Sequence, residues 1–172
     1  MAKNKPFSDP ETHLKNIQRY LEQGFFLEDQ IASDRSKLKR LSSLSYSLSS
    51  PGDLSGAKVQ TSPANEAAFT ESVEQKDEVE EKLRREISLM IALQTQMADV
   101  INQYTTGAEN RILTERYINC QTEKKVAELT HYCLRQIKRK TDIAMSRIIL
   151  PEDAIWINWN ALQQQVPDHA LS

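Results

Sequence analysis

Glycine, cysteine and aromatic residues are all scarce in this chain. Its 172 residues include four glycines and two cysteines, and aromatic residues make up 6% of the sequence. Apolar residues at 39% and charged residues at 27% are ordinary for a folded domain, so the shortage lies in the residue types that build turns and sheets. This balance favours an all-α protein whose helices keep long exposed faces.

Long hydrophobic runs and chemical motifs are also missing. No apolar run approaches the roughly 18 residues that a membrane-spanning helix needs, and the opening MAKNKPFSDPETH has no signal-peptide core. No nucleophile–base pair, phosphate-binding loop or carboxylate cluster is recognisable. Cys120, His131 and Cys133 lack a fourth metal ligand, and we interpret them as turn and cap residues. We therefore predict a cytoplasmic protein that is not an enzyme, has no cofactor or metal, and does not contact membranes.

The net charge of −2 conceals two segments of opposite sign. Residues 66–104 hold nine acidic and four basic side chains, a balance of about −5, whereas residues 111–150 hold nine basic and four acidic ones, about +5. Phosphate attraction acts over roughly a Debye length, about 10 Å at 0.1 M salt. The basic segment can therefore bind a polyanion although the whole chain is acidic.

The spacing of apolar residues predicts two long helices. An amphipathic helix is expected over residues 11–41, after a disordered lead-in at 1–10, and a second, coiled-coil-like helix over residues 66–104. Between them, residues 42–65 are rich in Ser, Gly and Pro and are predicted to be a flexible linker. The stripe on the second helix consists of Phe69, Val79, Leu83, Ile87, Met90, Met97, Ile101 and Tyr104. A single stripe of this length needs a partner helix, either the first helix in an antiparallel hairpin or a second copy in a homodimer.

Residues 108–150 have the layout of a helix-turn-helix. A support helix is expected from Ala108 to Tyr117, and Thr122 is a natural N-cap for the next helix. A turn at residues 130–132 then precedes a helix that begins after Cys133. Ile137, Ala144 and Ile148 recur at intervals of seven and four and form its buried side. In this motif the second helix enters the DNA major groove.

The tail at residues 151–172 is acidic and contains both tryptophans. Pro151 ends the preceding helix. Alternation of Ile155, Ile157 and Trp159 indicates a short extended piece, although a helix is also compatible with the pattern. Trp156 and Trp159 are either anchors for a partner or contacts that fold back on the helices.

Three stretches carry a resemblance to a known family. RYINCQTEKKVA (Arg116–Ala127), the segment from Cys133 to Ala144, and SGAKVQTSPANEAAF (Ser55–Phe69) resemble the phage-encoded sigma-like regulators of Gram-positive bacteria, the RinA/ArpU group of late-gene activators. Residues 115–148 are similar to domain four of bacterial sigma factors. The resemblance implies a helix-turn-helix that binds promoter DNA in a bacterial host cell, with host RNA polymerase as a further partner.

The chain departs from that family at the turns. Cys120 and His131 stand where the family has glycine, and Cys133 stands where a Ser or Thr cap is usual. A residue other than glycine in a left-handed conformation costs about 1 kcal/mol, and a missing hydroxyl cap costs about the same. Local stability is therefore expected to be lower, with the DNA-facing side unaffected.

The predicted contacts with double-stranded DNA fall into two sets. An arginine can hold guanine O6 and N7, and a glutamine can hold adenine N6 and N7. Contacts to phosphates fix the register of the protein on the duplex without reading its sequence. We assign base readout to Leu134, Arg135, Gln136, Lys138 and Thr141, and phosphate contacts to Lys124, Lys125, Arg139, Lys140 and Arg147.

Taken together, these patterns predict a sequence-specific transcriptional regulator of a phage or prophage, an activator of late genes. Two alternatives remain open from the sequence. A small terminase-like DNA-packaging subunit also combines a helix-turn-helix with oligomerising helices. A coiled-coil interaction protein would account for the long helices without any contact to DNA.

Overall fold

The computed structural model describes residues 10–49 and 63–160, and every regular element within these ranges is helical. The two long helices are α1 (Pro10–Ser49) and α2 (Pro63–Tyr104). They are followed by α3 (Gly107–Leu113), the π-helical segment η1 (Thr114–Ile118), α4 (Glu123–Thr130) and α5 (Leu134–Arg147). The predicted all-α class is confirmed. The lead-in at residues 1–9 and the tail beyond residue 160 lie outside the described residues.

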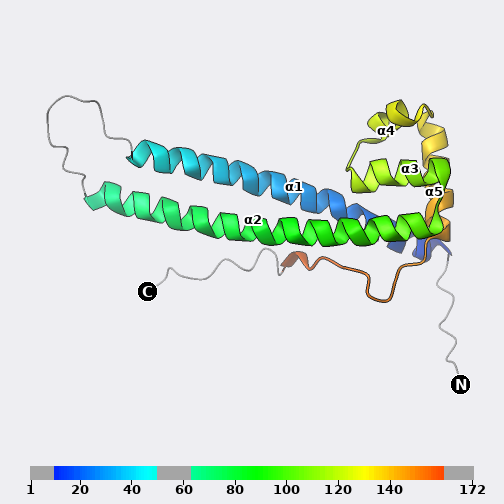
Figure 1. Ribbon diagram of the computed structural model, residues 1–172, viewed down its shortest axis with the longest axis horizontal. Helices are drawn as coiled ribbons and strands as arrows, with labels where there is room; N and C mark the ends of the chain where they lie inside the picture. Colours follow the sequence, from blue (N-terminus) through cyan, green and yellow to red (C-terminus); the bar gives the residue numbers. More distant parts are fainter. Residues whose placement is uncertain (1–9, 50–62, 161–172) are drawn as a thin grey trace, which may run out of the picture. The chain divides into compact units, whose positions relative to one another are not determined.

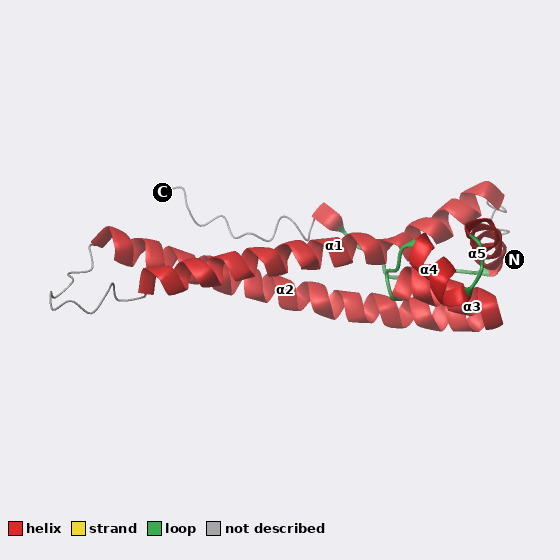
Figure 2. Cartoon of the chain, turned by 90° about the horizontal axis from the view of Figure 1, so that it is seen from above, coloured by secondary structure: helices red, strands yellow, loops and turns green. Residues whose placement is uncertain are grey.

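The described residues form two compact units. The first contains residues 10–28 of α1, residues 90–104 of α2 and everything from α3 to Trp159. The second contains residues 29–49 of α1 and 63–89 of α2. Within each unit, α1 and α2 run antiparallel and side by side (Figures 1 and 2). The predicted stripe on α2 therefore has a partner within the same chain.

The seam between α1 and α2 repeats at intervals of seven residues. On α2, the buried side chains include Ser72, Val79, Glu86, Leu93 and Val100. An unbroken seven-residue interval keeps one face of a helix turned toward its partner, as in a coiled coil. Two of these five positions are polar, so an apolar pattern alone cannot reveal the register.

The stripe predicted from the sequence is wrong at its first residue. Phe69 is 37% exposed, whereas Ser72, three residues later, is buried. The hydroxyl of Ser72 donates to the carbonyl oxygen of Phe69, at 2.7 Å, and lies 3.1 Å from the hydroxyl of Ser45 on α1. The small serine pair occupies the seam because it satisfies its own hydrogen bonds, and this leaves the larger ring outside.

The linker predicted to start at residue 42 starts later, because α1 continues to Ser49. The serine hydroxyls in this stretch bond to carbonyl oxygens of the helix and therefore do not promote turns. Ser43 donates to the carbonyl oxygen of Lys39 at 3.0 Å, and Ser45 donates to that of Leu41 at 2.9 Å. Such bonds to the preceding helical turn let serine remain inside a helix. Residues 50–62 of the predicted linker lie outside the described residues.

A buried polar cluster interrupts the seam in the second unit. The ammonium group of Lys82 lies 2.8 Å from the Asp34 carboxylate and 3.5 Å from that of Glu86. Burial would raise the pKa of Asp34, but hydrogen bonds from Lys82 and Gln30 hold it below its usual value. Burial raises the pKa of Glu86, and the neighbouring Asp34 charge raises it further. The cluster thus holds one cation between two carboxyl groups whose pKa values are shifted in opposite directions.

In the first unit, Gly24 allows α1 to lie against the backbone of η1. A Cβ atom at this position would meet the carbonyl oxygen of Tyr117 at 3.3 Å, closer than an ordinary van der Waals contact. The next residue, Phe25, packs against the Tyr117 ring with centroids 5.7 Å apart. The guanidinium of Arg116 lies 4.6 Å above the Phe25 ring. Glycine at this helical position is explained by close approach.

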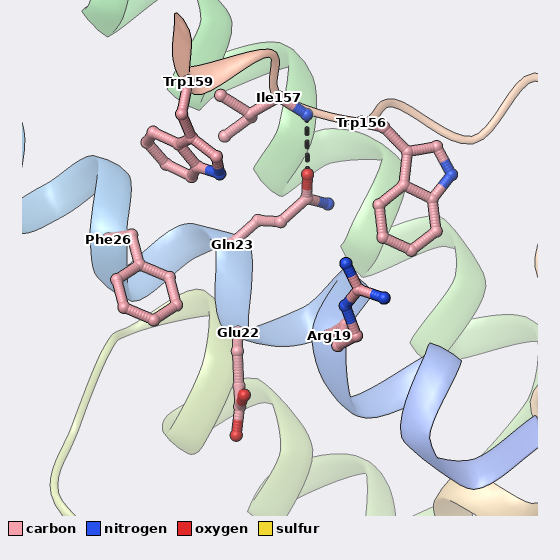
Figure 3. Close-up of a pocket in the computed structure, with 7 residues that line it drawn as sticks. All are labelled: Arg19, Glu22, Gln23, Phe26, Trp156, Ile157 and Trp159. Carbon is pink, nitrogen blue, oxygen red and sulfur yellow. Dashed lines mark hydrogen bonds between the residues drawn. The ribbon is translucent and has the colours of Figure 1, made fainter. Parts of the chain in front are cut away.

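The tail folds back onto the first unit as an extended segment, which resolves two questions left open by the sequence. The Gln23 side chain accepts from the backbone N–H of Ile157 at 2.7 Å and donates to the carbonyl oxygen of Ile155 at 3.1 Å (Figure 3). The Gln96 side chain donates to the carbonyl oxygen of Asp153 at 3.0 Å and accepts from the Ile155 N–H at 2.8 Å. Two glutamines from two helices thus hold the main chain of the tail.

Both tryptophans contact aromatic residues of α1. The Trp156 ring meets Tyr20 edge-on with centroids 5.7 Å apart, and the Trp159 ring meets Phe26 in the same manner at 6.1 Å. Figure 3 shows the two indoles on either side of Gln23. Trp156 remains 50% exposed and Phe26 61%. The tail is therefore attached at its backbone, and its aromatic side chains are only partly covered.

Candidate nucleic-acid interface

The three short helices α3, α4 and α5 share a small core. Ile112 of α3, Val126 of α4 and Ile137 of α5 are buried together, with Ala127 and Tyr132 packed against them. The predicted inward positions of α5 are confirmed, because Ala144 and Ile148 are fully buried as well. This core supports α5 from behind, so the opposite side of α5 is free to face solvent.

Local capping determines where α4 begins. The hydroxyl of Thr122 accepts from the Lys125 backbone N–H at 3.3 Å, which confirms the predicted N-cap. The guanidinium of Arg111 donates to the Leu129 carbonyl oxygen near the end of the same helix, at 2.9 Å. A positive charge near the C-terminus of a helix is stabilised by the helix dipole. Arg111 therefore stabilises the end of α4.

The turn between α4 and α5 contains the expected strained residue. His131 adopts a left-handed conformation with φ of 58° and ψ of 26°. Cys120, at the turn before α4, has φ of 50°. These are the two positions where glycine was expected from the resemblance. Both turns keep their left-handed geometry although neither residue is glycine, at a conformational cost of about 1 kcal/mol each.

Gln136 has a structural role that sequence reasoning missed. Its side-chain oxygen accepts from the backbone N–H of Cys133 at 3.2 Å, at the N-terminus of α5. This is the reciprocal half of a capping box, and it compensates for the absence of a Ser or Thr cap. A glutamine three residues after the cap position was the available signal. The oxygen that would accept from adenine N6 is thus already engaged within the protein.

The predicted base-readout residues lie on two different sides of α5. Leu134, Arg135, Gln136 and Lys138 are exposed, whereas Thr141 is half-buried. Lys138 and Thr141 border a cavity between α5 and α1. Arg135 does not border that cavity, and helical periodicity places it opposite the buried Ile137 and Ala144.

The predicted phosphate-contacting residues differ in their partners. Arg147 forms an ion pair with Glu109 at 2.9 Å, and Lys125 forms one with Glu128 at 3.1 Å. Lys140 is half-buried, with its ammonium group 5.1 Å from the centroid of the Tyr132 ring. An exposed ion pair such as Lys125–Glu128 contributes about 0–1 kcal/mol to stability. Among the described residues, no ion pair involves Lys124, Arg135, Lys138 or Arg139.

The outer face of α5 carries two residues that the sequence reasoning left out. Arg135, Arg139, Asp142 and Ser146 recur at intervals of four, three and four and are all exposed. We call these four residues the outer face. Asp142 follows Arg135 by seven residues, which was a sufficient signal to place it on the same side. Asp142 also borders the cavity between α5 and α1, so it lies at the edge of this face.

Comparison with protein-family profiles, with curated proteins and with solved structures gives no match to this chain. Across residues 10–49 and 63–160, no helix combines the length and apolarity needed to cross a bilayer. In the same ranges, no three His, Cys, Asp or Glu side chains gather in a way that could hold a metal ion.

Proposed function

We propose that α3, α4 and α5 form a sequence-specific unit that binds double-stranded DNA, with α5 in the major groove. One observation carries the proposal: Arg135 and Arg139 are exposed on one side of a helix whose other side is fixed by a buried core. A cationic helix held rigidly from behind is what major-groove recognition requires. Its cations stand near the helix N-terminus, where this motif contacts base edges.

The position of each cation on the helices indicates whether it contacts bases or phosphates. Arg135, in the first turn of α5, is placed for bidentate contact with guanine, a pair that contributes about 1–3 kcal/mol of discrimination. Arg139 and Lys124 are exposed cations that suit phosphates. Gln136 keeps its oxygen on the Cys133 N–H and has its amide nitrogen left for a single contact with a base.

The experiment measures both affinity and its dependence on salt. A duplex is first selected from a randomised pool with the full chain, and binding is then followed by fluorescence anisotropy. Arg135→Gln is expected to weaken binding to the selected duplex about 5- to 150-fold, and to change binding to unrelated duplexes much less. Arg139→Gln is expected to weaken binding to all duplexes, and to reduce the slope of log K against log salt by about 0.9.

A matched control comes from the second unit. Lys37→Gln removes an exposed cation from α1, so it leaves the outer face of α5 unchanged. The control is expected to bind the selected duplex like the unaltered chain. If Arg135→Gln and Lys37→Gln have the same small effect, α5 is not the reading helix.

The resemblance to sigma-like regulators extends the proposal to a biological setting. It assigns the DNA unit to phage or prophage late-gene promoters in the bacterial cytoplasm, with host RNA polymerase as a partner and activation as the outcome. In the described residues, α1 supplies the partner for the seam of α2, so burial of that seam needs no second copy. Light scattering tests this: a monomer or small oligomer agrees with regulation, whereas a ring of many subunits favours DNA packaging.

A further inference from the structure

The second unit buries as many polar side chains as apolar ones. Among the side chains described in residues 29–49 and 63–89, the buried ones are Ile31, Leu41, Val79, Asp34, Ser72 and Glu86. The first unit, in contrast, buries apolar side chains from each of the helices α1 to α5. Regions with few buried apolar contacts open locally at a lower free energy than the whole protein needs to unfold. The second unit is therefore the part of the chain where such opening is expected.

The carboxylate of Glu86 lies in the seam of this unit without a hydrogen bond. Its side chain is 0% exposed, and within the described residues neither of its oxygens has a hydrogen-bond partner. The ammonium group of Lys82 is 3.5 Å from Glu86 but 2.8 Å from Asp34. The Gln30 amide also donates to Asp34, at 3.2 Å. Both donors of the cluster are thus directed mainly to Asp34, and an ionised Glu86 is poorly compensated.

The charged groups that face Glu86 come from both helices of the unit. Asp34 lies across the seam on α1, and Lys82 lies one helical turn earlier on α2. Burial raises the pKa of Glu86, the Asp34 charge raises it further, and the Lys82 charge lowers it. The closed unit therefore favours the protonated form of Glu86. An open unit, in which water reaches the carboxylate, favours the ionised form.

We propose that the second unit is a pH-sensitive element, which opens locally when Glu86 ionises while the first unit stays folded. In the closed state, a protonated Glu86 adds no charge to the pair formed by Asp34 and Lys82. In the open state, water solvates the ionised carboxylate, and the apolar side chains of the seam are exposed. The proposal is independent of DNA binding, because none of these residues belongs to α3, α4 or α5.

The direction of the response follows from the two carboxyl groups. The folded-state pKa of Glu86 lies above its ordinary 4.5, so the closed state is most favoured below 4.5 and loses this advantage as pH rises through the raised value. The pKa of Asp34 lies below its ordinary 3.8, so its contribution is lost only at lower pH. Histidine, which ordinarily titrates between about pH 5 and 8, does not occur in residues 29–49 and 63–89.

Hydrogen exchange of the full chain, followed by mass spectrometry, measures the opening of each unit separately. The measurements run from about pH 5 to about pH 9, and rates are corrected for the pH dependence of intrinsic exchange. Protection of amides in residues 29–49 and 63–89 is expected to fall about tenfold, the effect of one buried polar group left without compensation. Protection of amides in α3, α4 and α5 is expected to stay constant.

Three variants separate Glu86 from other charges of the unit. Glu86→Gln cannot ionise, so protection of the second unit is expected to be independent of pH. Glu81→Gln removes a carboxylate of the same helix that is 58% exposed, and it is expected to keep the response of the unaltered chain. Asp34→Asn removes the second negative charge and leaves Lys82 to Glu86, so its response is expected to be smaller.

Several outcomes would overturn the proposal. A loss of protection of equal size in both units would mean that the chain unfolds as a whole. Protection of the second unit that does not change with pH, or that falls equally in Glu86→Gln, would remove the role of Glu86. A response lost in Glu81→Gln would assign it to exposed charges instead. Binding of duplex DNA is measured separately, and its failure would leave each of these results unchanged.

Discussion

Replacing Glu86 by glutamine is expected to stabilise the protein at neutral and alkaline pH. The Glu86 side chain is fully buried, whereas Lys82 lies 0.7 Å closer to Asp34 than to Glu86, at 2.8 Å against 3.5 Å. The charge of Lys82 is thus balanced mainly by Asp34, and an ionised Glu86 adds an excess negative charge inside the seam. A buried charge that is left uncompensated costs a protein about 3–5 kcal/mol, and because Lys82 compensates Glu86 in part, the expected gain lies below that range.

The pH dependence follows from the direction of the pKa shift. Burial raises the folded-state pKa of Glu86 above its ordinary 4.5. The folded protein therefore holds the proton more tightly, and the stability that Glu86 contributes is complete below 4.5 and is lost as pH rises through the raised value. Glutamine does not titrate. The difference in unfolding free energy between Glu86→Gln and the unaltered chain should be near zero around pH 4 and grow above it.

Thermal unfolding followed by circular dichroism across this pH range measures the effect. For a chain of this size, each kcal/mol moves Tm by about 2–4 °C. Glu81→Gln is a suitable control, because that carboxylate is 58% exposed and pairs with the exposed Arg84 at 3.5 Å. A Glu86→Gln variant that is less stable than the unaltered chain at alkaline pH would show that Lys82 needs both carboxylates, which refutes the reasoning.

The remaining predictions concern the tail and the turn before α5. Gln23→Ala removes the bonds to Ile155 and Ile157, and we expect a loss of about 1–3 kcal/mol, a red shift of tryptophan fluorescence and faster proteolysis of the tail; Asn16→Ala, an exposed change on the same helix, should have none of these effects. His131→Gly should raise the unfolding free energy by about 0.5–1 kcal/mol, because glycine adopts the left-handed conformation without strain. A less stable His131→Gly variant would mean that the imidazole itself supports the turn.

Local sequence signals were sufficient for the helices of the C-terminal region. Thr122 was predicted to cap α4 because capping depends on residues that are adjacent in the chain. Ile137 and Ala144 were predicted to be buried because their spacing alone puts them on one side of α5. The left-handed conformation of His131 was expected from the resemblance, because the family has glycine at this position.

The register of the seam was not predictable in the same way. Asp34 and Glu86 are polar, so a pattern of apolar residues assigns them to the surface. They are buried because Lys82 lies between them, and that contact joins residues about 50 positions apart in the chain. Pairing of this kind is decided by tertiary structure and leaves no local signal.

Roles within the candidate site were predicted only in part, for a related reason. A count of basic residues treats Arg111 and Arg116 like Arg135, although both donate to backbone carbonyl oxygens inside the fold. The sequence showed that the segment is cationic. It could not show which of the cations form hydrogen bonds within the fold. Gln136 illustrates the same point, since its cap at Cys133 competes with any contact to a base.

The attachment of the tail through its main chain has a consequence for which sequences it tolerates. Gln23 and Gln96 recognise an extended backbone, whatever side chains it carries, much as the edge of a sheet accepts an added strand. Exchanges at the exposed positions Asp153 and Asn158 should therefore leave the tail in place. Proline at Ile155 or Ile157 is the exception, because it removes the N–H group that one of the glutamines binds.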